Sequence, residues 1–385
     1  MTARPEAPSL HQLRVDCIGS FLRPAGLKQA YRHHAAGAID DAALARAQDD
    51  AIADLVAEEE AHGLPVVTDG EFRRAVFMES FSDVAGMDRW KSRWADKIKT
   101  LEEEQRSETA TGRKGVNPVL AGNEPVTQRL QLRANGPRAE YEYLQGLTRL
   151  PGKASLINPD RILQSVDLDA SSSIYPEITD LLADVVRMER EMVAGLREAG
   201  CRYVHIDAPG YTAYVDADSL AAMRARGDDP DALLERAIAA DNEVIAAFGD
   251  LTFGIHICRG NRHSQWHREG AYDAIAERLF SELDHDRLLL EYDDERSGDF
   301  TPLRYVPHGK TVVLGLVTTK RSELESRDCL LRRIDDATQY IDIDQLAISP
   351  QCGFASDMGG NVISEQAQWR KIELVCDIAT EVWGR

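Results

Sequence analysis

A histidine and a cysteine near the end of an apolar run are the residues whose types and spacing point most directly to chemistry. Segment 251–261 reads LTFGIHICRGN, and it places His256 and Cys258 two residues apart. Residues i and i+2 of a β-strand point to the same face, so the imidazole and the thiol are expected to project together. Zn²⁺ accepts this mixture of nitrogen and sulfur ligands. Taken alone, such a pair is more often explained by packing, because free cysteine is commonly a small buried hydrophobe.

Two further apolar runs end in residues that can bind a metal. Segment 288–291 reads LLLE and ends at Glu291, and segment 346–352 reads LAISPQC and ends at Cys352. If these runs are parallel neighbours of the His-x-Cys strand, all of their ends open at the same edge of the sheet. The residues alone leave a metal site and a packing role open, and the candidate ligands are His256, Cys258, Glu291 and Cys352.

Composition excludes several classes of partner. The 385 residues carry a formal net charge of −20, which argues against binding to nucleic acid or to an anionic membrane. We find no run of about 18 apolar residues and no signal peptide, so no membrane span is expected. The six cysteines have no framework spacing, which is typical of reduced thiols in the cytoplasm. The sequence therefore predicts a cytoplasmic protein.

Apolar strand-like runs alternate with helical patterns along most of the chain. Strands are expected at 15–20, 65–68, 153–157, 201–207, 251–258, 287–291, 311–317 and 346–349, each followed by a helix or helical connection. Eight such units predict an α/β fold, a (β/α)₈ TIM barrel that forms a single catalytic domain over 1–385. Segment 89–143 breaks the pattern and is interpreted as an inserted polar hairpin. The alternative is an open doubly wound sheet, which is less favoured because no glycine-rich nucleotide fingerprint follows an early strand.

Polar residues follow most of the expected strands, at the end where barrel enzymes carry their active sites. Besides the candidate metal ligands they are Ile18 to Ser20, Asp69 to Glu71, Asp207 and Thr318 to Lys320. Each has a simpler explanation: Asp69 or Ser20 can cap a helix, and Lys320 can be a solvated lysine at the rim. We expect His205 to be a hydrogen-bonded core histidine, His263 to be exposed, and 293–295 to form a solvated acidic loop.

Six motifs, in order along nearly the whole chain, resemble the catalytic barrel of the cobalamin-independent methionine synthase family in its short, single-barrel form. They are IGSFLRP at 18–24, VTDGEFRR at 67–74, HIDAP at 205–209, HIC at 256–258, Glu291 and SPQCGF at 349–354. The resemblance implies that Zn²⁺ is held by His256, Cys258, Glu291 and Cys352. It also implies that the amino acid head group of homocysteine meets the 18–20 turn, Glu71 and Asp207, with Ile18 and Ser20 supplying the turn.

The resemblance implies a zinc-dependent methyltransferase in which a zinc-bound thiolate attacks an alkyl carbon, with homocysteine giving methionine as the leading reaction. A metal-bound thiol is deprotonated near neutral pH, which makes it a good nucleophile. Glu291 can leave the zinc when the substrate thiolate arrives. The small thiol is the expected partner, and the oligomeric state stays open.

This chain departs from full-length synthases in three ways. It has no room for a second barrel, no tryptophan near 157–160 where the family stacks a pteridine, and Lys320 where the family has a histidine after the seventh strand. These departures count against direct use of methyltetrahydrofolate. The donor stays open between methyltetrahydrofolate, a methylcorrinoid and an epoxide. Epoxyalkane:coenzyme M transferases are similar too, with Lys320 as an anion hook or proton donor. A barrel that binds zinc without catalysis and a zinc hydrolase are the remaining alternatives, and two thiolate ligands disfavour the hydrolase.

Overall fold

The centre of the protein is a parallel sheet of six strands, in the order β3-β4-β5-β6-β7-β8. The computed structural model describes residues 10–88, 114 and 123–384. The strands span Lys153–Ile157 (β3), Tyr203–Asp207 (β4), Thr252–Ile257 (β5), Arg287–Glu291 (β6), Thr311–Val317 (β7) and Leu346–Pro350 (β8). Each strand pairs in parallel with the next one along the chain. These six strands confirm the predicted α/β alternation from residue 153 onward.

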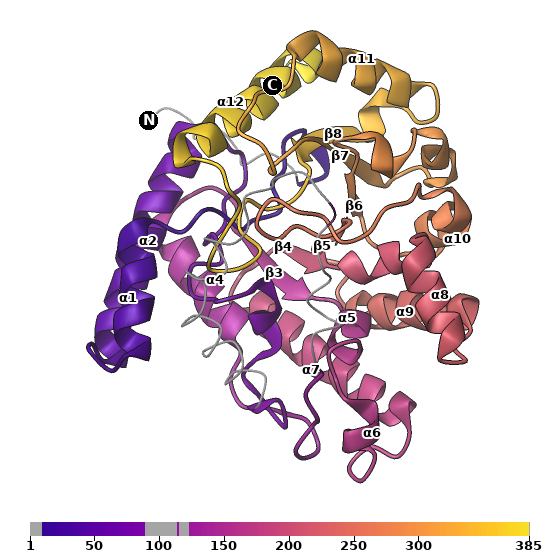
Figure 1. The fold of residues 1–385 in the computed structure, drawn as a ribbon. Helices are drawn as coiled ribbons and strands as arrows, with labels where there is room; N and C mark the ends of the chain where they lie inside the picture. Colours follow the sequence, from indigo (N-terminus) through magenta and orange to yellow (C-terminus); the bar gives the residue numbers. More distant parts are fainter. Residues whose placement is uncertain (1–9, 89–113, 115–122, 385) are drawn as a thin grey trace.

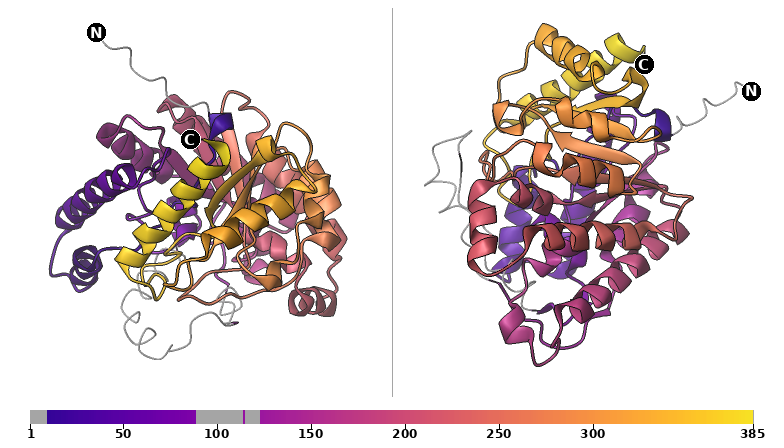
Figure 2. Two further views of the ribbon diagram at one scale, coloured as in Figure 1. Left: turned by 90° about the horizontal axis from the view of Figure 1, so that it is seen from above. Right: turned by 90° about the vertical axis from the view of Figure 1, so that its right-hand side faces the viewer.

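Helices surround this sheet on its outer side (Figures 1 and 2). The longer ones are α1 (Ala25–Ala35), α2 (Asp41–Ala61), α4 (Gly136–Leu147), α7 (Ile178–Glu198), α8 (Ala217–Ala225), α9 (Pro230–Ile245), α10 (Asp273–Glu282), α11 (Arg327–Thr338) and α12 (Glu365–Trp383). Short helical turns follow strand ends, namely α5 (Pro159–Leu163), α6 (Leu168–Ser171), η4 (Pro209–Tyr214), η5 (Glu295–Ser297) and η6 (Thr301–Tyr305). None of the helices in the described ranges has both the length and the apolar character that a membrane span needs.

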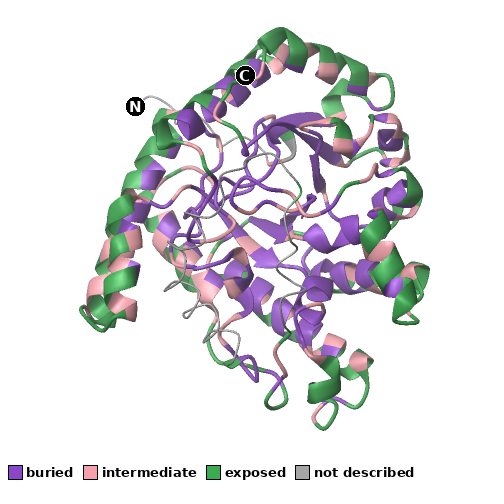
Figure 3. Cartoon of the chain, viewed as in Figure 1, coloured by how far each residue is buried: buried purple, intermediate pink, exposed green. Residues whose placement is uncertain are grey.

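Burial explains why the strands read as continuous apolar runs. All seven residues of β7, TVVLGLV, are buried, because helices cover one face of the sheet and side chains from other strands cover the other. The covering helices are amphipathic: α7 buries Leu181, Val185, Met188 and Met192 at helical spacing. Figure 3 shows the resulting division, with buried strands at the centre and exposed residues along the outer faces of the helices.

The first two predicted strands form only one bridge each. Val15 pairs with Ile348 of β8, and Val67 pairs with Gly152 next to β3, both in parallel. These two edge segments meet each other through the Thr68 hydroxyl, which donates to the carbonyl oxygen of Gly19 at 2.8 Å. Gly19 has a φ of 124°, which breaks the extended conformation that a longer ladder needs. The sequence predicts eight full strands. In the described residues six of them form strands of the parallel sheet, and the first two form a single bridge each.

A buried charged cluster ties the first edge segment to the sheet. Asp16 accepts hydrogen bonds from Lys153 of β3 at 2.8 Å, Tyr203 of β4 at 2.7 Å and Arg287 of β6 at 3.1 Å. Burial alone would raise the pKa of Asp16, but the charges of Lys153 and Arg287 lower it below its usual value. The cluster fixes the start of the segment that ends at Ser20, so it helps to position the opposite rim.

The segment predicted as an inserted hairpin is only partly described. Residues 89–113 and 115–122 lie outside the described residues, so the hairpin prediction is untested there. Within the described part, β2 (Gln131–Leu132) pairs antiparallel with β1 (Val84–Ala85). The rest folds into α4, which packs beside β3, α2 and α7 in the outer layer. Asn135 caps α4, and its side chain accepts from the Arg138 N–H. The sequence analysis did not predict this helix.

Candidate metal centre and substrate site

Three of the four predicted metal ligands come together at the carboxyl end of the sheet. One ligand atom from each of His256, Cys258 and Cys352 lies within 4.8 Å of the other two, and all three residues are buried. His256 stands on β5 and Cys258 just after it, whereas Cys352 follows β8. Two strands separate β5 from β8 in the sheet, so these ends meet only because the sheet curls. A His-Cys-Cys set of this kind suits Zn²⁺.

The imidazole of His256 is oriented as a metal ligand would be. Its Nδ1 lies 3.2 Å from the carbonyl oxygen of Leu289 and must carry a hydrogen to bond there. Its Nε2 is buried and has no hydrogen-bond partner among the described residues. Burial lowers the pKa of His256, but the neighbouring Cys258 sulfur raises it to about 9. A cation at Nε2 would therefore displace a proton and satisfy a buried atom.

The surroundings of Cys258 disfavour its thiolate. The hydrogen bond with Cys352, together with burial, raises the pKa of Cys258 well above its usual range. A thiolate is the species that binds a metal. The residues present therefore fit a divalent cation, because its charge would stabilise the Cys258 thiolate that the buried site otherwise disfavours.

Glu291, the fourth predicted ligand, lies outside this group and is bound to cations. Its Oε1 accepts from Arg296 Nη2 at 2.6 Å, and its Oε2 accepts from the backbone N–H of Arg259 at 2.5 Å. Burial alone would raise the pKa of Glu291, but Lys320, Arg296 and Arg259 lower it to about 2. Glu291 is thus an anion whose lone pairs are already used by protein donors.

Lys320 is buried rather than solvated. Its Nζ lies 3.8 Å from a carboxylate oxygen of Glu291 and 3.8 Å from one of Asp293. The prediction of a solvated acidic loop is wrong for Asp293, whose side chain is 2% exposed and also contacts Arg296 at 2.8 Å. The residues after β6 and β7 therefore form one buried ion cluster beside the metal group.

The predicted homocysteine residues lie on the same rim. Ser20 contacts the loop that carries Cys352: its carbonyl oxygen accepts from the Phe354 N–H at 2.8 Å, and its Oγ would be 1.9 Å from a Cβ on Gly353. The side chain of Ile18 packs in the interior with Leu289 and two other apolar residues. Ile18 would therefore contact a ligand only through its backbone atoms.

Glu71 and Asp207 each present a buried oxygen with no partner. Glu71 Oε1 accepts from Ser155 Oγ at 3.1 Å, while Oε2 has no hydrogen bond among the described residues. Asp207 pairs in register with His256, and its Oδ1 is likewise without a partner there. Burial raises the pKa of Glu71, and it raises that of Asp207 to about 6. An ammonium group between such carboxylates would donate the hydrogen bonds that their oxygens lack.

The turn that carries Glu71 is strained and anchored. Glu71 has a φ of 58°, which is uncommon for a residue with a side chain. Its backbone N–H donates to Asp69 Oδ1 at 3.0 Å, so Asp69 supports this turn, whereas the simpler explanation expected it to cap a helix. Asp69 Oδ2 is nevertheless buried without a partner among the described residues, and burial raises the pKa of Asp69 to about 6. Strain that is held by its surroundings is typical of functional sites.

Two histidine predictions need correction. His263 is buried, with 3% exposure, and its Nε2 lies 3.9 Å from Asp357. The polar loop after β5 folds back over the rim, whereas a run of polar residues suggests an exposed loop. His205 is a core residue as predicted, but neither ring nitrogen has a hydrogen-bond partner among the described residues. Its ring stacks on that of His256, with centroids 6.0 Å apart.

Several arginines at the rim are buried, and their role at this site was not predicted from the sequence. Arg161, Arg259, Arg268 and Arg296 all lie in the first residues or loops after strands β3, β5 and β6, and each is largely buried. Arginine is usually exposed, so its type alone gave no signal. Their positions just after strand ends were the available clue.

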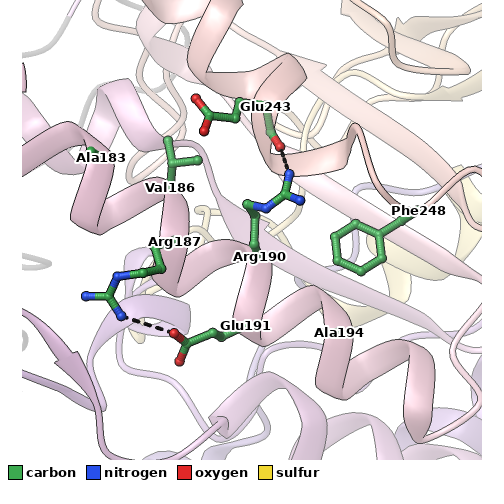
Figure 4. Close-up of a pocket in the computed structure, with 8 residues that line it drawn as sticks. All are labelled: Ala183, Val186, Arg187, Arg190, Glu191, Ala194, Glu243 and Phe248. Carbon is green, nitrogen blue, oxygen red and sulfur yellow. Dashed lines mark hydrogen bonds and ion pairs between the residues drawn. The ribbon is translucent and has the colours of Figure 1, made fainter.

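A separate pocket lies on the outer surface of the protein. It has a volume of about 470 Å³ and is lined by residues of α7 and α9 together with Phe248 (Figure 4). Arg190 donates there to the carbonyl oxygen of Glu243, and Arg187 pairs with Glu191 at 3.1 Å. No candidate metal ligand lines this pocket, so it is distinct from the site at the sheet rim.

Comparisons with known proteins assign the family. The model of the cobalamin-independent synthase catalytic domain matches residues 14–372. The Bacillus subtilis protein YxjH, described as uncharacterized, is 34% identical over 373 residues, which cover 96% of this chain and 94% of that protein. The methionine synthase of Sulfolobus acidocaldarius is 21% identical over 352 residues, 89% of this chain and 85% of that protein. The chain belongs to the family of cobalamin-independent methionine synthase catalytic domains, which are methyltransferases.

Solved structures support the fold. The putative vitamin-B12-independent methionine synthase of Listeria monocytogenes aligns with a TM-score of 0.73 and 23% identity, covering 98% of this chain and all of that one. A B12-independent methionine synthase of Shewanella, solved with selenomethionine, aligns with a TM-score of 0.69 and 16% identity, covering 96% and 98%. At this level of identity the likeness concerns the fold alone.

Proposed function

We propose that this protein is a zinc-dependent methyltransferase that acts on a small thiol, with homocysteine as the leading acceptor and methionine as its product. The observation that carries the proposal is the convergence of His256, Cys258 and Cys352 within 4.8 Å. A zinc ion held by these residues would supply a fixed Lewis acid that lowers the pKa of a substrate thiol. Glu291 could act as a fourth ligand only after its hydrogen bond with Arg296 is broken.

The remaining residues have roles in binding and orientation. Glu71 and Asp207 would accept hydrogen bonds from the ammonium group of homocysteine, because each has a buried oxygen without a partner among the described residues. Ser20 and the backbone at Ile18 would orient the acceptor from the segment that lies beside the turn of Glu71. Lys320 would help to keep Glu291 ionised. Its place between two carboxylates does not favour the role of an anion hook.

The rest of the proposal concerns the setting of this site. The bridges at Val15 and Val67 support an eight-stranded barrel closed around the site, with the chain as one catalytic domain. The six cysteines, none in a disulfide, are consistent with a reducing compartment such as the cytoplasm. The methyl donor is left open between a folate, a corrinoid and another electrophile.

Calorimetry of the zinc-loaded protein tests the acceptor. L-homocysteine and coenzyme M are titrated separately, in two buffers that differ in ionisation enthalpy. A thiol that reaches zinc as thiolate should release about one proton. We expect this for homocysteine with the wild type and with Cys329→Ser, whose thiol is exposed, but not with Cys352→Ser. Binding of coenzyme M alone would instead favour epoxide opening, and no binding of either thiol would contradict the proposal.

A further inference from the structure

Two buried arginines at the rim lack partners for much of their hydrogen-bonding capacity. Arg161 is 7% exposed, and its Nε and Nη1 are buried without a hydrogen-bond partner among the described residues. Arg268 is 9% exposed, and its Nε is also buried without a hydrogen-bond partner among the described residues. Its Nη1 donates to the carbonyl oxygen of Pro209 at 2.7 Å. Guanidinium groups are normally paired when they are buried, so these two need an explanation.

Both arginines are held in place by their backbones. Arg161 stands on α5, directly after β3, and its N–H donates to the Asn158 carbonyl oxygen at 3.1 Å. Arg268 lies in the loop after β5, and its N–H donates to the Arg259 carbonyl oxygen at 3.1 Å. The two side chains therefore reach the rim from the ends of β3 and β5, which lie on either side of β4. Preorganised donors of this kind are what a binding site requires.

The two guanidinium groups also oppose each other. Burial lowers the pKa of Arg161 to about 9, and the positive charge of Arg268 adds to the effect. Burial likewise lowers the pKa of Arg268. The backbone bond from Arg268 to Arg259, the residue after Cys258, places this loop beside the metal group.

Asp207 is near enough for its charge to raise the pKa of Arg161, and its Oδ1 has no hydrogen-bond partner among the described residues. Two further carboxylates whose charges reach these arginines, Asp160 and Asp216, are engaged elsewhere. Asp160 accepts from Gln164 at 2.7 Å and lies 3.6 Å from Arg236. Asp216 accepts from Ser219 and from the Glu269 N–H. Among the described residues no carboxylate forms an ion pair with either arginine within the 4.0 Å that defines one. Two like charges therefore stand buried without a carboxylate in direct contact among the described residues.

We propose that Arg161 and Arg268 form an anion subsite that receives a carboxylate, sulfonate or phosphate group of a substrate bound beside the metal ligands. Planar guanidinium groups recognise such oxyanions through two parallel hydrogen bonds. An anion between them would satisfy the free donors and remove the mutual repulsion. The anion subsite stands on these contacts alone; only its link to a substrate rests on the proposed function. The anion belongs either to the acceptor thiol or to the alkyl donor.

Sulfate is the probe for this subsite. The melting temperature (Tm) is measured against sodium sulfate, with sodium chloride holding the ionic strength constant. Sulfate also stabilises proteins nonspecifically, so the comparison among variants decides the outcome. We expect a saturable rise in Tm for the wild type and for Arg190→Gln, an arginine of the outer pocket. For Arg161→Gln and Arg268→Gln we expect the half-saturating concentration to rise at least about tenfold, as loss of one charge-assisted bond predicts.

The same variants separate binding from a structural role. An arginine that only supports the fold would lower Tm in the absence of sulfate when it is replaced. Loss of an unpaired buried charge should leave Tm unchanged or raise it. An equal sulfate response in wild type and Arg161→Gln would overturn the proposal.

Saturating L-homocysteine identifies the source of the anion. If homocysteine abolishes the sulfate response of the zinc-loaded wild type, the subsite receives the acceptor's carboxylate. If the response persists while homocysteine binds, the subsite belongs to the donor. The sulfate response needs neither zinc nor thiol. A protein that binds sulfate through Arg161 but does not bind homocysteine would therefore retain the subsite and contradict only the proposed acceptor.

Discussion

Arg296 holds the carboxylate of Glu291 at 2.6 Å and keeps it outside the group formed by His256, Cys258 and Cys352. The arginine side chain is 8% exposed, so water weakens this contact little. A metal at the three-residue group would then have one coordination position without a protein ligand. Catalytic zinc sites keep such a position for substrate, whereas structural sites close it.

Replacement of Arg296 tests whether this contact reserves that position. In Arg296→Gln the pKa of Glu291 should rise from about 2 towards its usual value, because the nearest guanidinium is gone. The carboxylate would then be free to act as a fourth ligand. We expect tighter zinc binding in competition with a chelator, and homocysteine binding that is about tenfold weaker. Arg304→Gln, on an exposed arginine of the next turn, is the control. Unchanged zinc and thiol affinities in Arg296→Gln would refute this role.

Cys352 is expected to be essential for metal binding. Cys352→Ser should weaken zinc binding by more than the roughly 10–100-fold that is typical for loss of an outer-shell partner, because it removes a ligand itself. Cys329→Ser changes an exposed thiol and should leave affinity and stoichiometry intact. Elemental analysis after dialysis against a weak chelator measures both. Full zinc occupancy in Cys352→Ser would mean that the ligand set is wrong.

Gly353 should tolerate no side chain. A Cβ there would stand 1.9 Å from Ser20 Oγ and 3.1 Å from Ser20 Cβ, so the loop after Cys352 and the 18–20 turn would have to separate. Gly353→Ala is expected to cost about 1–3 kcal/mol of unfolding free energy and to weaken homocysteine binding. Gly249→Ala, where no atom lies within 4 Å of the new Cβ, is the matched control. Denaturant unfolding at constant zinc gives the comparison, and equal midpoints for the two variants would contradict the packing argument.

Asp241 should make stability depend on pH. It is fully buried and accepts from Tyr211 at 2.5 Å and from Asn158 at 3.3 Å, and burial raises its pKa to about 7. The folded pKa exceeds the unfolded value of about 3.9. Its contribution to stability is therefore fully present below about pH 4 and is lost as the pH rises through 7. The loss is at most about 4 kcal/mol, from a difference of about three pKa units.

The substitution Asp241→Asn removes the titratable carboxyl group but keeps an oxygen that accepts from the Tyr211 hydroxyl. We expect Asp241→Asn to unfold at higher urea than the wild type at pH 8 and at similar or lower urea at pH 4. Asp250→Asn, at an exposed ion pair, serves as the control and should not show this crossover. A constant difference between Asp241→Asn and wild type across this range would show that Asp241 does not titrate there.

Much of this fold is readable from the sequence, for identifiable reasons. Strands buried on both faces, such as β6 and β7, give uninterrupted apolar runs, and their predicted bounds match the structure. The first two segments were harder to predict, since a bridge at Val15 or Val67 depends on contacts with distant strands. Helix α4 was missed because the polar stretch before it obscured where the helical pattern resumes.

The candidate site was predictable where residue type and strand position agree. His256 and Cys258 needed only the two-residue period of a strand, and Cys352 only the expectation of a parallel neighbour. The contacts of Glu291 with Arg296 and Arg259 arise from loop conformation, which no local pattern encodes. The burial of Arg161, Arg268 and His263 likewise follows from how the loops after β3 and β5 fold over the rim.

The central claim, that the acceptor thiol joins a site made by His256, Cys258 and Cys352, is tested most directly by zinc X-ray absorption. The spectrum of the zinc-loaded protein is recorded with and without L-homocysteine, and Cys329→Ser is measured alongside. We expect the zinc ion to have two sulfur neighbours without homocysteine, from Cys258 and Cys352, and three sulfur neighbours when homocysteine is bound. A sulfur count that stays at two when homocysteine is shown to be bound would contradict the account.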